Sequence, residues 1–69
     1  MDRVEKHRHA AETHAEAASR HEEAAAYWRA RGDLVRADLE SRNVEIERLA
    51  AQLEIDKAAV EEADPLPDP

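Results

Sequence analysis

The chain has 69 residues, of which 39% are charged and 3% aromatic, so it can form one small domain without a conventional aromatic core. It contains no cysteine, which excludes disulfides and thiolate metal sites. The net charge of −7 lies entirely in residues 32–69, which carry eleven acidic and four basic side chains. Because phosphate contacts need clustered lysine and arginine, nucleic acid is not an expected partner.

The first predicted helix covers residues 2–31, a stretch without glycine or proline that is rich in Ala, Glu and Arg. One of its faces repeats with alternating spacings of three and four residues, which is typical of a coiled coil. The residues of this face are His7, Ala10, His14, Ala17, His21, Ala24 and Trp28. Further alanines beside it, Ala11, Ala18 and Ala25, widen the face.

Gly32 and Asp33 predict a tight turn, because glycine suits the residue after a helix and aspartate suits the start of the next one. The surrounding segment, 25–37, resembles the middle of a tetratricopeptide repeat. The matching residues are Ala25, Trp28, Gly32, Asp33 and Ala37. Ser41 stands where the family has a large apolar residue, and no repeat follows. The resemblance therefore implies a helix-turn-helix corner and no peptide groove.

The second predicted helix covers residues 33–62 and carries a face of larger side chains. This face consists of Val35, Leu39, Arg42, Ile46, Leu49, Leu53, Asp56 and Val60. The tail, residues 64–69, contains three prolines and is predicted to be disordered. Residues 1–63 therefore form one helical hairpin, in which the short turn makes the helices antiparallel. In composition, the chain is similar to small helical proteins of actinobacteria, a likeness that implies no activity.

We expect the alanine face of the first helix to pack against the large face of the second. A turn between Gly32 and Asp33 pairs residues whose numbers sum to about 65. The expected neighbours are Ala58 and Asp56 for His7, Ala51 for His14, and Val44 and Glu45 for His21. Because so short a chain buries little apolar surface alone, we expect a homodimer that forms a four-helix bundle.

The histidines at seven-residue intervals, His7, His14 and His21, have three interpretations. They are packing residues whose ring edges reach carboxylates or solvent. Alternatively, they bind a divalent transition metal between two chains, because histidines seven apart lie about 10.5 Å apart on one helix and cannot share an ion. Thirdly, they make the contact between the two helices, which we call the seam, respond to pH. We expect stability to fall as pH drops from about 7.5 to 5.5, because burial disfavours the charged imidazolium, whereas pairing with Asp56 and Glu45 would reverse this dependence.

The remaining features favour a protein without catalytic activity. Ser19 and Ser41 lie within helices and not on a strained nucleophile turn. Tyr27 and Trp28, near the turn, are candidates for binding a protein partner. No apolar run reaches the length of a membrane span, so a cytoplasmic protein without membrane contact is expected. The predicted function is that of a small interaction, scaffold or regulatory protein without a cofactor, and the alternative is a transition-metal-binding bundle.

Overall fold

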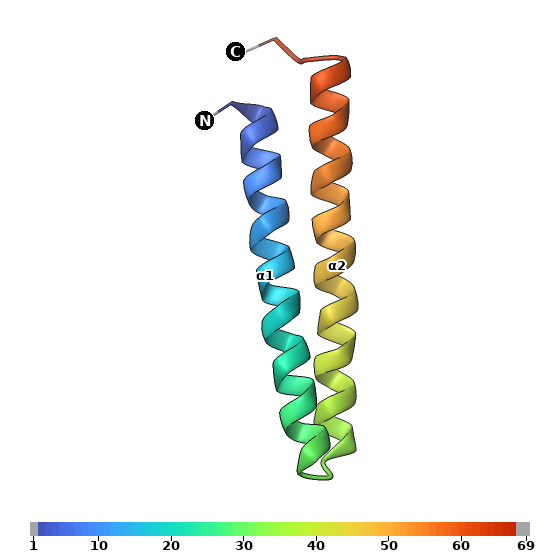
Figure 1. Cartoon of the computed structure of the whole chain (residues 1–69). Helices are drawn as coiled ribbons and strands as arrows, with labels where there is room; N and C mark the ends of the chain where they lie inside the picture. Colours follow the sequence, from blue (N-terminus) through green and yellow to red (C-terminus); the bar gives the residue numbers. More distant parts are fainter. Residues whose placement is uncertain (1, 68–69) are drawn as a thin grey trace.

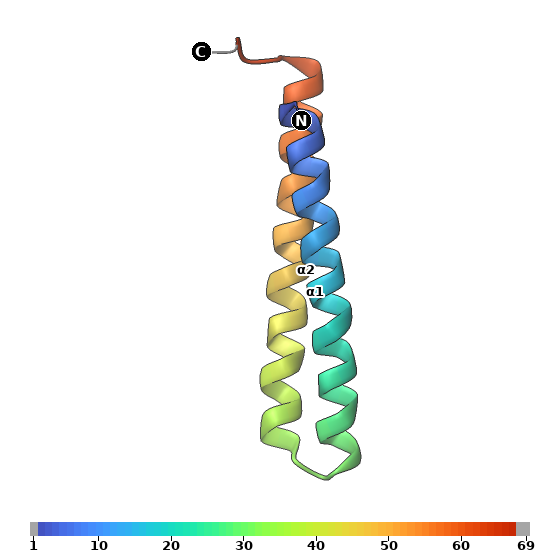
Figure 2. The same ribbon diagram turned by 90° about the vertical axis from the view of Figure 1, so that its left-hand side faces the viewer.

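The computed structural model describes residues 2–67 and consists of two helices joined by a short turn (Figure 1). Helix α1 covers Arg3–Ala30 and helix α2 covers Leu34–Ala63. The helices run antiparallel along a rod of 52 × 17 × 16 Å, and the start of α1 and the end of α2 lie at the same end (Figures 1 and 2). The predicted all-α antiparallel hairpin is confirmed, with helix ends one residue from those predicted.

An aspartate begins each helix. The side chain of Asp2 accepts a hydrogen bond from the backbone N–H of Glu5 at 2.8 Å, and Asp33 accepts one from the backbone N–H of Arg36 at 3.0 Å. Each bond satisfies a donor that the first helical turn leaves unpaired. Hydrogen bonds from the Arg36 backbone and side chain also lower the pKa of Asp33. These caps fix where both helices start.

The turn is built on Gly32, the only glycine of the chain, which has a φ of +75°. The backbone N–H of Gly32 donates to the carbonyl of Arg29 at 3.0 Å, and that of Asp33 donates to the carbonyl of Trp28 at 3.0 Å. This pair of bonds is the Schellman motif, which requires a left-handed residue after the helix. Asp33 therefore closes α1 through its backbone and caps α2 through its side chain.

The two helices contact each other through small residues. The buried apolar residues are Ala11, Ala18 and Ala25 of α1 and Ala37, Val44 and Ala58 of α2. The alanines of α1 that were expected at the centre of the seam, Ala10, Ala17 and Ala24, are only half-buried. The expected packing of small residues against the large face of α2 is therefore wrong. That large face points away from α1.

The histidines of α1 give a physical reason why the large face of α2 points away from α1. A leucine or isoleucine opposite each ring would leave a half-buried N–H without an acceptor, which costs free energy. The α2 line that faces α1 supplies glutamates at these levels and small residues between them. It consists of Ala37, Glu40, Val44, Glu47, Ala51, Glu54, Ala58 and Glu61. Small residues on both helices also allow a close approach.

The contacts between the helices scatter around the expected register, in which paired residue numbers sum to about 65. The histidine contacts, such as His7 with Glu54, sum to 61. The ion pairs of Arg8 with Glu62 and of Arg48 with Glu22 sum to 70. The hydrogen-bond partner of His7 is therefore Glu54, and not the expected Asp56.

The open end of the hairpin is closed by Glu61, a charged residue that is only 8% exposed. Its carboxylate lies 3.5 Å from the guanidinium of Arg3 and accepts a hydrogen bond from the backbone N–H of Leu66 at 3.3 Å. Arg3 also donates to the carbonyl of Leu66 at 2.8 Å. Residues 64–67 are non-helical and begin the tail, whose disorder stays a prediction, while residues 68–69 lie outside the described part.

Within residues 2–67, neither helix has a stretch that is both long and apolar enough to cross a membrane. The helices carry charged side chains along most of their length, including ion pairs between the two helices. Two exposed ones join Arg8 to Glu62 and Arg48 to Glu22, and such surface pairs contribute little to stability.

Candidate functional site

Three histidines of α1 each contact one glutamate of α2, and we call these contacts the histidine ladder. In each rung, the ring Nδ1 lies 2.6 Å from a carboxylate oxygen. The rungs are His7–Glu54, His14–Glu47 and His21–Glu40. Because an ionised carboxylate can only accept, the ring N–H is the donor in each rung. The ladder therefore consists of three equal hydrogen bonds across the helix contact.

The rungs are separated by layers of alanine. Successive rungs are seven residues apart on both helices, which corresponds to about 10.5 Å along the axis. Ala11 lies between the first two rungs on α1, and Ala18 lies between the last two, and both are buried. Polar and apolar layers therefore alternate along the seam. This alternation allows the carboxylates to be satisfied without interrupting the close approach of the helices.

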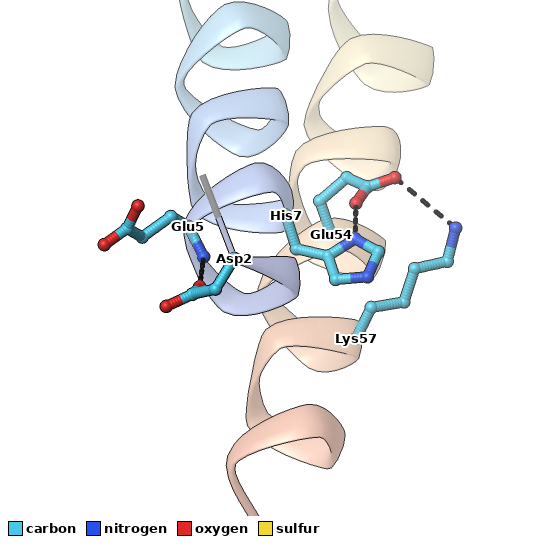
Figure 3. Close-up of polar contacts among 5 residues, drawn as sticks. All are labelled: Asp2, Glu5, His7, Glu54 and Lys57. Carbon is cyan, nitrogen blue, oxygen red and sulfur yellow. Dashed lines mark hydrogen bonds and ion pairs between the residues drawn. The ribbon is translucent and has the colours of Figure 1, made fainter. Parts of the chain in front are cut away.

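The first rung has a further partner. Glu54 lies between the ring of His7 and the ammonium of Lys57, whose Nζ is 3.4 Å from the second carboxylate oxygen (Figure 3). The side chain of His7 is 29% exposed and that of Glu54 is 17% exposed. The hydrogen bond from His7 lowers the pKa of Glu54, and Lys57 adds to this effect, while burial opposes it. The carboxylate is therefore held in its ionised form.

The seven-residue spacing of the histidines predicts their place on the inner side of α1 but does not identify their partners. Asp56, one of the expected partners, instead accepts a hydrogen bond from Gln52 at 3.0 Å on the exposed side of α2. The three glutamates of the ladder recur every seventh residue, with the same period as the histidines. That shared period was the available signal. It was missed because the larger side chains of α2 were assigned to the seam.

The ladder does not form a metal centre within one chain. Among residues 2–67, no three histidine, aspartate or glutamate side chains come together as a group able to hold a metal ion. Each rung offers one imidazole and one carboxylate, already joined to each other. The predicted transition-metal site takes histidines from two chains, so a single chain does not test it, and it stays a prediction.

The aromatic pair at the turn is held by cations of its own chain. Tyr27 and Trp28 pack edge to face, with ring centroids 5.0 Å apart. The guanidinium of Arg31 lies 4.1 Å from the Tyr27 centroid, and that of Arg36 lies 5.0 Å from the Trp28 centroid. Trp28 is half-buried, whereas Tyr27 is 50% exposed. Partner binding by these two residues stays a prediction.

The largest apolar surface lies along α2, on the side turned away from α1, and we call it the outer face. It consists of Val35, Leu39, Arg42, Ile46, Leu49, Leu53, Asp56 and Val60. Its six aliphatic side chains are between 52% and 73% exposed. Leu49 is two residues from both Glu47 and Ala51 of the inner line, and two residues correspond to a rotation of about 200°. The outer face is therefore nearly opposite the contact with α1.

Comparisons with family models, with curated proteins and with solved structures found no match to this chain.

Proposed function

We propose that this protein is a non-catalytic interaction protein and that the outer face of α2 is its binding surface. The observation that carries this proposal is the exposure of six large aliphatic side chains in one line, which only Arg42 and Asp56 interrupt. Contiguous apolar surface of this kind is rare on isolated soluble chains and marks a site of association. Helix α1 does not cover it, because α1 packs on the opposite side of α2.

The spacing of the residues on the outer face indicates which kind of structure its partner has. Alternating steps of four and three residues run from Val35 to Val60, over most of the length of α2. A seven-residue repeat drifts slowly around a straight helix, and supercoiling with a second helix of the same repeat keeps the line at the contact. The partner is therefore a second long helix, supplied by another copy of the chain or by another protein.

A photo-crosslinking amino acid placed at Leu49 in the full chain tests the surface directly. We expect irradiation in the native host to give an adduct of discrete mass. A matched position is Glu16, which is exposed on the outer side of α1 and has no large apolar neighbour in the helical repeat. The same amino acid at Glu16 should give no such adduct. Placed at Tyr27, it tests the predicted aromatic site at the turn.

A second substitution shows whether an adduct depends on the outer face. Leu53→Glu should abolish the adduct formed at Leu49, because it places a charge in the apolar line. Ala15→Glu, at an exposed position of α1, should leave it unchanged. Equal labelling from Leu49 and Glu16, or an adduct that survives Leu53→Glu, would contradict the proposal.

A further inference from the structure

We propose that the outer face of α2 binds the outer face of a second copy of this chain in antiparallel orientation. In this arrangement, Arg42 of each copy lies beside Asp56 of the other. The inference rests on the proposed function, because it names the partner of the same surface. It places the two α2 helices at the centre of the assembly and the two α1 helices on its outside.

The surface is large enough for self-association. Six aliphatic side chains, each at least half exposed, offer on the order of 500 Å² of apolar surface per chain. Two copies would therefore remove on the order of 1,000 Å² from water before flanking residues are counted. This value is close to the lower limit of specific interfaces between proteins. No other part of the described chain presents a comparable line of large aliphatic residues.

The two charged residues of the outer face select the orientation. Arg42 and Asp56 are fourteen residues apart and occupy equivalent positions in the seven-residue repeat. In a parallel dimer in register, Arg42 would face Arg42 and Asp56 would face Asp56 across the same apolar interface. Like charges at such a site are strongly unfavourable. An antiparallel dimer brings opposite charges together twice, once on each side of the two-fold axis.

The register of the antiparallel pair follows from the apolar positions. The two-fold axis passes between Ile46 and Leu49. Ile46 of each copy therefore packs against Leu49 of the other copy. Arg42 then lies level with Leu53 of the second copy, and Asp56 of that copy is three residues away. Three residues correspond to about 4.5 Å along the helix, within reach of an arginine side chain.

Both charged groups are available for this exchange. Arg42 forms an ion pair with Asp38 at 2.8 Å, and both side chains are well exposed, so the pair is weakly held. Asp56 accepts a single hydrogen bond, from Gln52. An incoming second copy can therefore add a guanidinium to Asp56 without breaking a buried contact.

The antiparallel arrangement also brings together two cations at the margin of the interface, Arg36 and Lys57 of opposite copies. Each of them is paired with a carboxylate of its own chain, Arg36 with Asp33 and Lys57 with Glu54. The like charges are therefore compensated within each copy. The margin does not oppose the orientation that Arg42 and Asp56 favour.

Charge reversal on the purified full chain tests the pairing. Sedimentation equilibrium should show a dimer for the natural sequence. Arg42→Asp and Asp56→Arg, made singly, should each raise the dimer dissociation constant about tenfold or more, because each places like charges together. The double variant should return it to within about threefold of the natural value. Single variants as tight as the natural chain, or a double variant weaker than both, would overturn the proposal.

Engineered cysteines test the orientation separately, because the natural chain has none. A mixture of Val35→Cys and Val60→Cys chains should form a mixed disulfide under mild oxidation, since the two positions lie at the same level of the antiparallel pair. Val35→Cys alone should form no disulfide dimer, because its two copies are more than 30 Å apart at about 1.5 Å per residue. A disulfide of Val35→Cys with itself would overturn the orientation.

The oligomeric state of the purified chain shows whether self-association fails while the proposed function still holds. A purified chain that remains monomeric at about 100 μM would overturn self-association. If the crosslinker at Leu49 still formed an adduct with another protein that Leu53→Glu abolished, the proposed function would stand. If it formed no adduct, both proposals would fail.

Discussion

Replacement of Gly32 isolates the contribution of one backbone conformation to the hairpin. Gly32 has a φ of +75°, and its N–H and that of Asp33 close the end of α1. Apart from its two neighbours in the chain, a Cβ at this position would meet no atom within 4 Å. The cost of Gly32→Ala therefore arises from the backbone alone and not from a clash. The structure thus separates strain from packing at this residue.

The magnitude follows from two opposing terms. A left-handed conformation costs an L-residue about 1–2 kcal/mol. Alanine also restricts the unfolded chain, which returns about 0.4–1 kcal/mol. The net loss for Gly32→Ala is therefore about 1 kcal/mol, and for a domain of this size it lowers the melting temperature by about 4–8 °C.

The assay is thermal unfolding followed by far-ultraviolet circular dichroism at one fixed protein concentration, since association makes the melting temperature depend on concentration. Gly32→Asn should lose less stability than Gly32→Ala, because asparagine tolerates the left-handed region. Gly32→Val should lose more, because it is β-branched. An alanine variant that melts within 1 °C of the natural protein, or an asparagine variant as unstable as the valine one, would refute the reasoning.

Three further predictions concern the seam. Ala18→Leu should destabilise the hairpin by about 1–3 kcal/mol, because Ala18 is buried where the helices approach closely. The control Ala26→Leu, at an exposed position of α1, should change stability little, and equal urea midpoints for the two variants would contradict this. A double-mutant cycle of His14→Gln and Glu47→Gln should give a coupling of about 0.5–1 kcal/mol for their half-buried hydrogen bond, and additive effects would argue against the rung. Because the folded pKa of Glu54 is lowered, its contribution is present above the unfolded pKa and is lost as pH falls through the folded one. The stability difference between the natural chain and Glu54→Gln should therefore shrink as urea unfolding is measured from pH 6 down to pH 2.5, and a constant difference would be inconsistent with it.

The histidine ladder gives each of its rings a carboxylate partner, which bears on how the seam responds to pH. Two outcomes were open from sequence: burial of a charge without a partner, or pairing with a carboxylate. The structure places a carboxylate oxygen 2.6 Å from each ring of the ladder. The rings are also part-exposed, with 38% of the His14 side chain accessible. The rings of the ladder therefore have glutamate partners and are not buried without one.

The sequence by itself determined the elements and their connection. Uninterrupted helix formers define the two arms, and Gly32 with Asp33 defines the turn, because a left-handed residue and a helix cap are local requirements that few other residues meet. Asp2 caps α1 in the structure by the same local rule, whereas the predicted helix already included residue 2. Local signals of this kind need no knowledge of the partner helix. The hairpin was predictable for that reason.

Only the tertiary structure decided which side of α2 faces α1. The helix carries two lines with the same seven-residue repeat, one of large aliphatic residues and one of alanine, valine and glutamate. Hydrophobicity alone favours burying Leu49 and Leu53, which is why the sequence predicts the wrong side of α2 at the contact. The helix contact instead depends on how both surfaces fit at once: small residues bring the backbones close, and glutamates meet the histidine N–H groups at every second layer. Such complementarity is a property of two surfaces in one register, so the pattern of either helix alone does not contain it.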